Sequence, residues 1–367
     1  MKVNFEEVLQ DITKLGTKVT TDKYQKQGDY PIIDQGQKFI AGYLNGHEGL
    51  LEDIPVIIFG DHTRILKYVD FPFFLGADGV KVLKVKNTNF LSKYVYYNLC
   101  ATAIPNTGYN RHFKWLKQAN LKAIPLEAQQ KIINSLDEIT ALIDKHKQQL
   151  EKLDLLVKSK FIEMFGDSEF NTKGFTLLKL SDLCTVGSSK RIYQTEQSKE
   201  GVPFLRISDL NNRIDGIEDT CELYIPEETY KSFALEGLIP NKGDILITAR
   251  GTLGRCYIVK ESDKFYFQDG MITWLSSLSN KVNSLYISYL FSTEGIKKQI
   301  ESLQAGSTVA YLSIAMTKKL NIMLPPIELQ NEFASFVEQT DKVKSKIKQS
   351  LEKFDILKKA LMQKYFG

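Results

Sequence analysis

The sequence is poor in the features that mark several large protein classes. Its 367 residues include only four cysteines, none at a CxxC spacing, so neither a disulfide framework nor a zinc site is indicated. No apolar run approaches the roughly 20 residues that a membrane helix needs. Residues 1–7 lack the apolar core of a signal peptide. These absences predict a cytoplasmic protein with reduced thiols and no membrane partner.

Catalytic and cofactor motifs are also missing. The chain contains no G-x-G dinucleotide fingerprint, no Walker A loop, no HExxH metal motif and no Asn/Asp-Pro-Pro-aromatic tetrapeptide of amino-methyltransferases. The adjacent pair Asp61 and His62 has no companion group and is interpreted as structural. We therefore expect no catalytic residue, no metal and no cofactor in this chain. An enzyme whose catalytic groups come together only in the fold remains an alternative.

The composition is that of a folded protein with more than one domain. The chain is 43% hydrophobic and contains 21 Phe and 17 Tyr, which is enough to form real cores. Its length predicts two or three structural units. The net charge of +4 is too small to indicate nucleic-acid binding, so any such function must depend on local clusters of charge.

An internal repeat sets the predicted architecture. When the sequence is shifted by 201 positions, residues 125–166 align with 326–367 without a gap, and 14 of the 42 pairs are identical. Short matches in the same order precede both blocks. The expected fold is α+β, with a first globular domain at 1–124, a long helix at 125–166, a second domain at 167–325 and a second long helix at 326–367.

Both helical blocks carry an apolar seam at spacings of three and four residues, and in the first block these spacings alternate. In the first block the seam is Ile132, Leu136, Ile139, Ile143, His146, Leu150, Leu153, Val157, Lys160 and Met164. In the second it is Phe333, Val337, Thr340, Val343, Ile347, Leu351, Phe354, Leu357, Leu361 and Tyr365. Two seams of equal length predict an antiparallel coiled coil, a rod of about 60 Å. Separate packing of each helix on its own domain is the alternative, and His146 is expected to be a packed core residue.

One loop of the second domain has the composition of a DNA-contacting segment. Residues 243–248 predict a turn followed by a strand, and the loop 249–255 then supplies two arginines, a threonine and two glycines before another strand at 256–259. Arginine can bind phosphate or read guanine with two hydrogen bonds. An ordinary hairpin turn with solvated arginines is the alternative. The DNA-facing candidates in this domain are Arg206, Arg250, Thr252, Arg255, Ser307 and Thr308.

In the first domain, residues 106–115 alternate aromatic, basic and amide side chains, as nucleic-acid surfaces do. They lie in a stretch, residues 79–126, that contains no acid but many lysines, which predicts a positive face. A basic edge without function is the alternative. The DNA-facing candidates in this domain are Lys38, Tyr109, Asn110, Arg111, His112 and Lys114.

Taken together, these features resemble the specificity subunit of a bacterial type I restriction-modification system over essentially the whole chain. The most specific matches are the segments 201–210 and 242–255 and the two Pro-x-Glu-x-Gln helix starts, at Pro125 and Pro326. In the first domain, residues 34–43 and 57–62 are similar to that family as well.

The resemblance implies a concrete function. Each globular domain would be a target-recognition domain for one half of a bipartite, asymmetric site in double-stranded DNA, and the coiled coil would set the gap between the halves. Two modification subunits carrying S-adenosylmethionine would methylate adenine, and restriction subunits would add ATP- and Mg²⁺-dependent cleavage. This chain itself would be non-catalytic. The alternatives are a related restriction system with a different partner arrangement, or a coiled-coil interaction scaffold.

Overall fold

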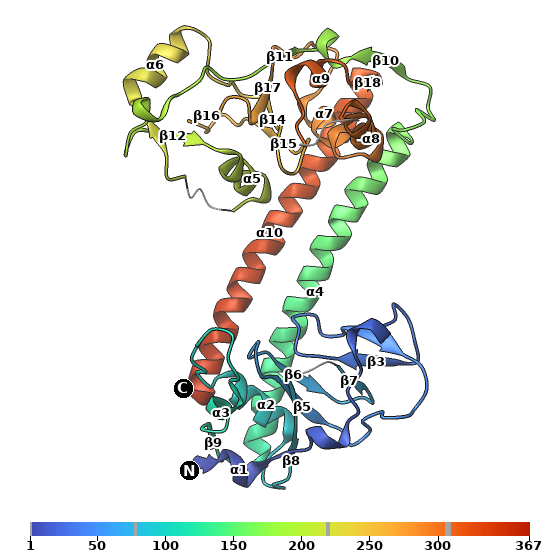
Figure 1. The fold of residues 1–367 in the computed structure, drawn as a ribbon, viewed down its shortest axis with the longest axis vertical. Coiled ribbons are helices and arrows are strands. Elements are labelled where there is room, and N and C mark those ends of the chain that lie inside the picture. The colour runs from blue at the N-terminus through green and yellow to red at the C-terminus, as the bar shows by residue number, and fades with distance from the viewer. Residues whose placement is uncertain (1, 77–78, 218–220, 305–309) are drawn as a thin grey trace. The chain divides into compact units, whose positions relative to one another are not determined.

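The computed structural model of the chain describes residues 2–76, 79–217, 221–304 and 310–367, and it divides into two compact units (Figure 1). Unit 1 comprises residues 1–149 and 347–367, and unit 2 comprises residues 150–346. Each unit therefore contains one globular domain and one end of each of two long helices. The four-segment division expected from the sequence stays a prediction.

The globular part of unit 1 is an α+β domain. Its strands are β1 (Lys2–Asn4), β2 (Leu9–Asp11), β3 (Tyr30–Ile33), β4 (Gly42–Leu44), β5 (Val56–Gly60), β6 (Leu66–Val69), β7 (Phe74–Leu75), β8 (Val80–Val85) and β9 (Asn120–Lys122). Its short helices are α1 (Phe5–Val8), α2 (Ser92–Cys100) and α3 (Phe113–Leu116). One sheet has the order β2-β8-β5-β6, a second has the order β4-β3-β7, and β1 pairs with β9.

The globular part of unit 2 repeats this arrangement. Its strands are β10 (Thr176–Lys179), β11 (Thr185–Gly187), β12 (Val202–Leu205), β13 (Tyr224–Ile225), β14 (Ile245–Thr248), β15 (Cys256–Ile258), β16 (Tyr266–Phe267), β17 (Ile272–Ser276) and β18 (Asn321–Leu324). Its helices are α5 (Ile207–Asp215), α6 (Glu227–Leu235), α7 (Ser284–Phe291), α8 (Glu294–Leu303) and α9 (Ile314–Lys318). The sheet orders are β11-β17-β14-β15 and β13-β12-β16, and β10 pairs with β18. The internal repeat predicted from the sequence is therefore confirmed in the strand order.

The central strands form where the sequence has short continuous apolar runs. All five residues of β5 and all four of β14 are buried, because each strand lies inside its sheet and is covered on both faces. The turn, strand, loop and strand predicted at 243–259 are confirmed by β14 and β15. These two strands matter for function because each of them leads into a surface loop.

The two long helices are α4 (Leu126–Phe165) and α10 (Ile327–Phe366), within one residue of the expected spans. Proline precedes each helix, where a missing N–H has no intrahelical partner to lose. The first helix ends at Gly166, whose positive φ of 74° suits a helix stop and whose N–H donates to the Ile162 carbonyl at 2.8 Å. No helix of the described chain is both long enough and apolar enough to cross a membrane.

The antiparallel pairing of α4 and α10 is confirmed in both units. In unit 1, His146 of α4 packs its ring edge on Phe354 of α10, with ring centroids 5.4 Å apart. In unit 2, Phe161 of α4 contacts Phe333 of α10 at 5.4 Å. The end of each helix also enters the core of the domain that precedes the other helix: α4 reaches the core of unit 2, and α10 that of unit 1.

Most of the predicted seam is confirmed, because 13 of its apolar residues are buried or half-buried. The buried ones are Ile132, Leu136, Ile139, Ile143, Val157, Phe333 and Val337. The half-buried ones are Leu150, Leu153, Ile347, Leu351, Phe354 and Leu361.

The prediction was wrong at two positions of the second seam. Val343 and Leu357 are 48% and 45% exposed. The seam positions belong instead to the next residues, Lys344 and Lys358, which restore a strict alternation of four and three. Lys344 is 16% exposed and pairs with Asp154 of α4 at 2.7 Å. A lysine can take such a position because its methylene stem covers apolar surface while the ammonium group reaches a carboxylate.

The Pro-x-Glu-x-Gln motif is explained by a buried glutamine that fastens each long helix to its domain. The Gln129 side chain accepts a hydrogen bond from Leu91 N at 2.8 Å and donates to the Asn89 and Ile124 carbonyls, both at 2.8 Å. Gln330 makes the same three bonds in the second repeat. It accepts from Asn283 N at 2.9 Å and donates to the Lys281 and Pro325 carbonyls, at 3.0 and 2.8 Å. Both glutamine side chains are fully buried.

A buried tyrosine ties the preceding helix to the last strand in the same way. Tyr94 of α2 donates its hydroxyl to the Lys122 carbonyl at 2.8 Å. Tyr286 of α7 donates to the Met323 carbonyl at 3.0 Å. The repeat thus conserves these supporting contacts, whereas the loops at the edges of the two domains differ.

Candidate nucleic-acid interface

In unit 1, the hairpin loop between β5 and β6 anchors the basic and aromatic loop 106–112. The Asp61 carboxylate accepts a hydrogen bond from Phe113 N at 2.7 Å. The Asp61 carbonyl accepts one from His112 N at 2.8 Å, and a ring nitrogen of His112 lies 3.0 Å from the same oxygen. Asp61 is 4% exposed, so it is a structural group, as its isolated position in the sequence indicated.

This anchoring corrects the role expected for His112. Its side chain is fully buried, and its second ring nitrogen lies 3.3 Å from the Thr107 hydroxyl. A side chain without exposed surface cannot face DNA. His112 is instead a positioning residue that holds the loop on which Tyr109 and Arg111 are displayed.

The exposed tip of this loop carries Tyr109, Asn110 and Arg111. Tyr109 is 89% exposed and lies flat on the His62 ring, with centroids 4.7 Å apart and an interplanar angle of 8°. Asn110 donates its amide to the Thr107 carbonyl and so shapes the turn. Arg111 is exposed, and its guanidinium has no hydrogen bond or ion pair within the described residues.

Lys38 lies on a neighbouring loop that a buried lysine supports. The Lys67 side chain is 4% exposed, and its ammonium group donates to the carbonyls of Asp34 at 2.8 Å and Lys38 at 2.6 Å. Burial lowers the pKa of Lys67, and the nearby Asp34 carboxylate opposes this shift only in part. The Lys38 side chain itself is exposed and therefore available to a ligand.

The acid-free stretch 79–126 does not form the uniformly positive face expected from the sequence. Four of its lysines are neutralised by acids from other parts of the chain, at 2.6–3.0 Å: Lys81 by Asp11, Lys84 by Asp53, Lys93 by Asp137 and Lys117 by Glu6. Lys114 is exposed and lies 5.0 Å over the Trp115 ring. Arg111 and Lys114 differ from these four lysines, because both are exposed and neither has an ion pair among the described residues.

In unit 2, the corresponding hairpin loop, residues 249–255, is closed by a buried threonine at the end of β14. The Thr248 hydroxyl donates to the Thr252 carbonyl and accepts from Arg255 N at 3.0 Å. Gly254 N donates to the Thr248 carbonyl at 3.0 Å. The loop is therefore compact, with the side chains of Arg250 and Thr252 exposed.

A buried carboxylate stabilises the start of the same strand. Asp244 is 7% exposed and accepts hydrogen bonds from Trp274 Nε1 and Asn241 N, both at 2.9 Å. Burial raises the pKa of Asp244, and the two hydrogen bonds oppose the rise. This carboxylate supports β14 from inside the domain and does not face a ligand.

The arginines predicted to face DNA in unit 2 differ in their availability. Arg250 is exposed, and its guanidinium lies 5.0 Å over the Tyr311 ring. Arg255 is bound to α5, where it donates to the Asn211 side chain at 2.8 Å and forms an ion pair with Asp215. Its hydrogen bonds hold the pKa of the Asp215 carboxyl below its usual value.

Arg206 stands at the start of α5 and is also engaged within the domain. Its guanidinium lies 3.6 Å from the Asp209 carboxylate and 3.9 Å from that of Glu222. Its backbone N–H donates to Asp209 at 2.8 Å. Two further candidates, Ser307 and Thr308, lie outside the described residues, so their roles stay predictions.

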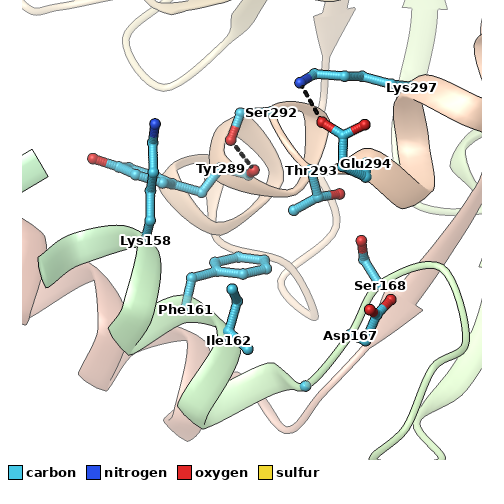
Figure 2. Close-up of a pocket in the computed structure, with 11 residues that line it drawn as sticks. Lys158, Phe161, Ile162, Asp167, Ser168, Tyr289, Ser292, Thr293, Glu294 and Lys297 are labelled. Carbon is cyan, nitrogen blue, oxygen red and sulfur yellow. Dashed lines mark hydrogen bonds and ion pairs between the residues drawn. The ribbon is translucent and has the colours of Figure 1, made fainter. Parts of the chain in front are cut away.

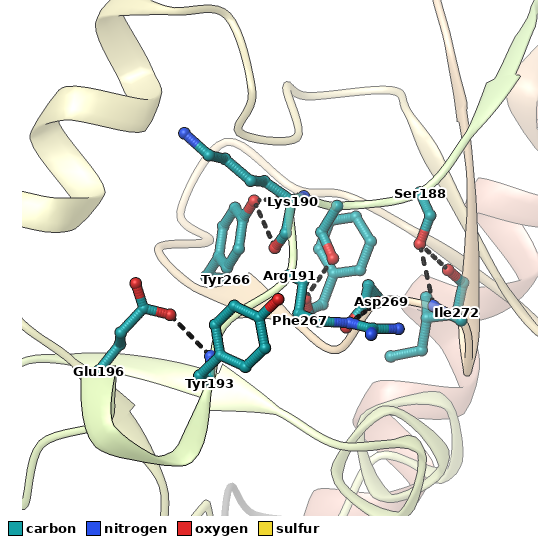
Figure 3. Close-up of polar contacts among 11 residues, drawn as sticks. Ser188, Lys190, Arg191, Tyr193, Glu196, Tyr266, Phe267, Asp269 and Ile272 are labelled. Carbon is teal, nitrogen blue, oxygen red and sulfur yellow. Dashed lines mark hydrogen bonds and ion pairs between the residues drawn. The ribbon is translucent and has the colours of Figure 1, made fainter.

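Unit 2 has a further surface loop, residues 188–193, that the sequence analysis did not single out (Figure 3). The Ser188 hydroxyl donates to the Ile272 carbonyl at 3.0 Å and Ser189 to the Phe267 carbonyl at 2.6 Å, which fastens the loop to the sheet. Arg191 pairs with Asp269 at 2.9 Å, and Tyr193 is 62% exposed. The sequence pattern that could have indicated this loop is the adjacent basic pair Lys190 and Arg191, with Tyr193 two positions later.

The hollow beside the end of α4 in unit 2 has a volume of about 320 Å³ and lies against α7 and the start of α8 (Figure 2). Two pairs of its lining residues contact each other: Glu294 pairs with Lys297 at 2.7 Å, and the Ser292 hydroxyl donates to the Tyr289 carbonyl at 2.6 Å. Among the residues that the structure describes, no group of three or more His, Cys, Asp or Glu could hold a metal ion.

Comparison with known proteins agrees with the geometry of the two units. Residues 3–155 and 172–353 match the family described as type I restriction modification DNA specificity domain. Among solved structures, a type I restriction-modification system S subunit from M. genitalium shares the fold, with a TM-score of 0.63 and 17% identity. The match covers 100% of this chain and 96% of that one. A chain from a study of complex assembly in the type I system gives a TM-score of 0.53 at 15% identity, covering 100% of this chain and 97% of its own length.

Sequence relatives have similar descriptions. A putative type I restriction enzyme specificity subunit of Haemophilus influenzae is 27% identical over 241 residues, which are 64% of this chain and 59% of that protein. A type I restriction enzyme specificity subunit of Escherichia coli is 22% identical over 348 residues, covering 91% of this chain and 84% of its own length. The aligned region thus spans less than two thirds of the Haemophilus relative.

Proposed function

The chain belongs to the family of type I restriction-modification DNA specificity domains, and on this premise we propose that it selects a bipartite, asymmetric DNA site for partner enzymes. Each unit reads one half of the site. The chain itself performs no catalysis, and adenine methylation or DNA cleavage is carried out by the partners on the DNA that it binds.

The observation that carries this proposal is a repeated scaffold with different loops. The sheets of the two units have the same strand order, and equivalent glutamines fasten the two long helices to the domains that precede them. The equivalent hairpin loops carry different residues: Asp61 and His62 follow β5 in unit 1, whereas Ala249 and Arg250 follow β14 in unit 2. Two similar modules with different contact surfaces suit a site with two different halves.

The long helix pair supports the role of a spacer. Each helix has 40 residues, which at about 1.5 Å per residue is a length of about 60 Å. At about 3.4 Å per base pair, such a length corresponds to no more than roughly 17 base pairs between the centres of the half-sites. A continuous helix is a stiff connection, so the gap between the half-sites is proposed to be fixed.

The partners proposed are two modification subunits, which bring S-adenosylmethionine, and restriction subunits, which bring ATP and Mg²⁺. The repeat supports a pair of equivalent docking positions, because the two units have the same strand order and each globular domain is followed by a helix of 40 residues. This chain supplies none of the cofactors. A cytoplasmic location follows from a DNA substrate and reduced cysteines.

Within the interface, the side chains divide by their availability. Arg111 and Arg250 are proposed to read bases, because their donors are unused within the described residues. Lys38, Lys114 and the exposed amide and hydroxyl groups of Asn110 and Thr252 are proposed to position the duplex on its phosphates. Arg206, Arg255 and Arg191 form ion pairs with carboxylates of their own domain, so their charge is already partly neutralised.

Mapping methylated adenines across a genome tests the proposal. Cells that produce the modification subunits are compared with and without this chain. The expected result is a new bipartite motif with two defined halves and a gap of fixed length, present only with the chain. Methylation that is identical in both cells, or a single continuous motif, would contradict the proposal.

The salt dependence of DNA binding distinguishes DNA recognition from the alternative of a coiled-coil interaction scaffold. A protein that neutralises phosphates loses affinity steeply as salt rises. Binding of labelled duplex by the assembled complex is measured at low and at physiological salt, with the Arg250→Ala variant as a comparison. Binding that is absent or insensitive to salt would favour a scaffold.

A further inference from the structure

Two loops meet at equivalent positions in the two units. The first residue after β5 is Asp61, whose N–H donates to the Gly79 carbonyl at 2.6 Å and whose carbonyl accepts from His112 N at 2.8 Å. The first residue after β14 is Ala249, whose N–H donates to the Met271 carbonyl and whose carbonyl accepts from Leu312 N, both at 2.9 Å. Equivalent backbone hydrogen bonds thus join the hairpin loop to the loop before α3 in unit 1 and to the loop before α9 in unit 2.

The residue that follows each anchor lies against a tyrosine from the opposite loop. In unit 1, His62 follows Asp61 and stacks on Tyr109. In unit 2, Arg250 follows Ala249, lies 5.0 Å over the Tyr311 ring and pairs with Tyr311 along the backbone. The tyrosines come from positions two residues apart in the aligned loops, so the sequences alone do not show the correspondence.

The arginine in this arrangement is unusual in this chain. Of the seven arginines, Arg111 and Arg250 alone have a guanidinium without a hydrogen bond or ion pair among the described residues. The other five are engaged: Arg64 with the Ile104 carbonyl, Arg191 with Asp269, Arg206 with Asp209, Arg213 with Asp263 and Arg255 with Asp215. Contact with Tyr311 therefore orients Arg250 without using its donors.

We propose that each unit carries one aromatic-supported base-contact pair, Arg250 on Tyr311 and His62 on Tyr109, and that the two pairs contact opposite half-sites. Tyr311 is a positioning residue, and His62 becomes a DNA-contacting residue with Tyr109. This inference rests on the proposed function, because it presumes that the two units read DNA.

The chemistry of stacking explains why such a pair suits base recognition. A guanidinium on an aromatic ring uses its flat face, so the N–H donors around its edge remain available for a bidentate contact with guanine. Holding the side chain in one orientation removes part of the entropy lost on binding. In unit 1, Tyr109 stacks on His62 with one face of its ring and is 89% exposed, so the other face is open to a base.

The test uses the complete complex with its modification subunits and a DNA library in which each base of the two half-sites is varied. Tyr311→Leu removes the ring but keeps the backbone pairing, and Tyr311→Phe keeps the ring. The leucine variant is expected to relax discrimination about two- to fivefold at one half-site and to leave the other unchanged. The phenylalanine variant is expected to keep the wild-type preference. Tyr109→Leu should relax the opposite half-site, with Tyr109→Phe as its matched control.

An equal loss of methylation on every sequence, or an unchanged preference at both half-sites, would overturn the inference. Arg250→Lys provides a second approach, because it keeps the charge but loses the forked donors; it should relax the same half-site as Tyr311→Leu. Failure of the proposed function is distinguishable, since the wild-type complex would then show no bipartite motif at all. If the wild type shows the motif and all four leucine and phenylalanine variants share it, only the inference fails.

Discussion

The buried glutamine at the start of α10 gives the sharpest test of how the helix is held to its domain. Gln330→Met replaces the amide side chain by an apolar one that is close to glutamine in length and in helix propensity. The change removes all three hydrogen bonds of the Gln330 side chain. It leaves the Asn283 N–H and the Pro325 carbonyl without partners, whereas the Lys281 carbonyl, on an exposed residue, can bind water.

The magnitude follows from the two orphaned groups. Each buried donor or acceptor left without a partner costs about 1–3 kcal/mol, so the variant should lose about 2–6 kcal/mol of stability. Urea unfolding followed by circular dichroism measures the loss as a lower midpoint of the transition. Amide exchange of Asn283 should also become faster, because its N–H has lost its acceptor.

Matched variants make the interpretation specific. Gln349→Met changes an exposed glutamine of the same helix and should stay within about 0.5 kcal/mol of wild type. Gln129→Met should act on unit 1 as Gln330→Met acts on unit 2. A loss below about 0.5 kcal/mol for Gln330→Met would refute the reasoning, because the buried amide would then not be holding the helix start.

Three further predictions address the helix seam, a buried carboxylate and the loop anchor. Phe354→Ala should destabilise the protein by about 2–4 kcal/mol in urea unfolding, whereas Leu357→Ala, outside the seam, should cost less than about 1 kcal/mol; equal losses would restore the seam expected from the sequence. Burial raises the pKa of Asp244 above its ordinary 3.8, so the folded state binds the proton more tightly and stability should fall as the pH rises from about 3.8 through the folded pKa. Asp244→Asn should flatten this part of the stability profile, and an unchanged slope would assign it to another group. Asp61→Ala frees the Phe113 N–H and the loop that carries Tyr109, so methylation assays on half-site variants should show relaxed selection at the first half-site alone; relaxed selection at both would contradict this.

Architecture was predictable because its signals are local and repeated. A long heptad pattern, proline at each helix start and a gapless repeat identified both helices and their pairing. The seam register failed at Lys344 and Lys358, because an apolar neighbour stands directly before each lysine. Only the partner helix, which brings Asp154 to Lys344, shows that the lysine takes the inner position.

The candidate interface was predictable in its location more than in its individual residues. Arg255 and Arg250 are indistinguishable in the sequence, and only folding brings Asp215, forty positions away, to Arg255. In the same way, Asp11 and Asp137 neutralise lysines of a stretch that contains no acid of its own. His112 was expected at the surface among aromatic and basic neighbours, and its burial depends on the distant carbonyl of Asp61.

The central claim is that two different reading modules are held at a fixed separation by the helix pair. Inserting one heptad into α4 and one into the facing part of α10 tests it most directly, with methylated adenines mapped for the wild type and the lengthened protein. The account predicts the same two half-site sequences with a longer gap between them. An unchanged gap in a protein that still methylates DNA would contradict it.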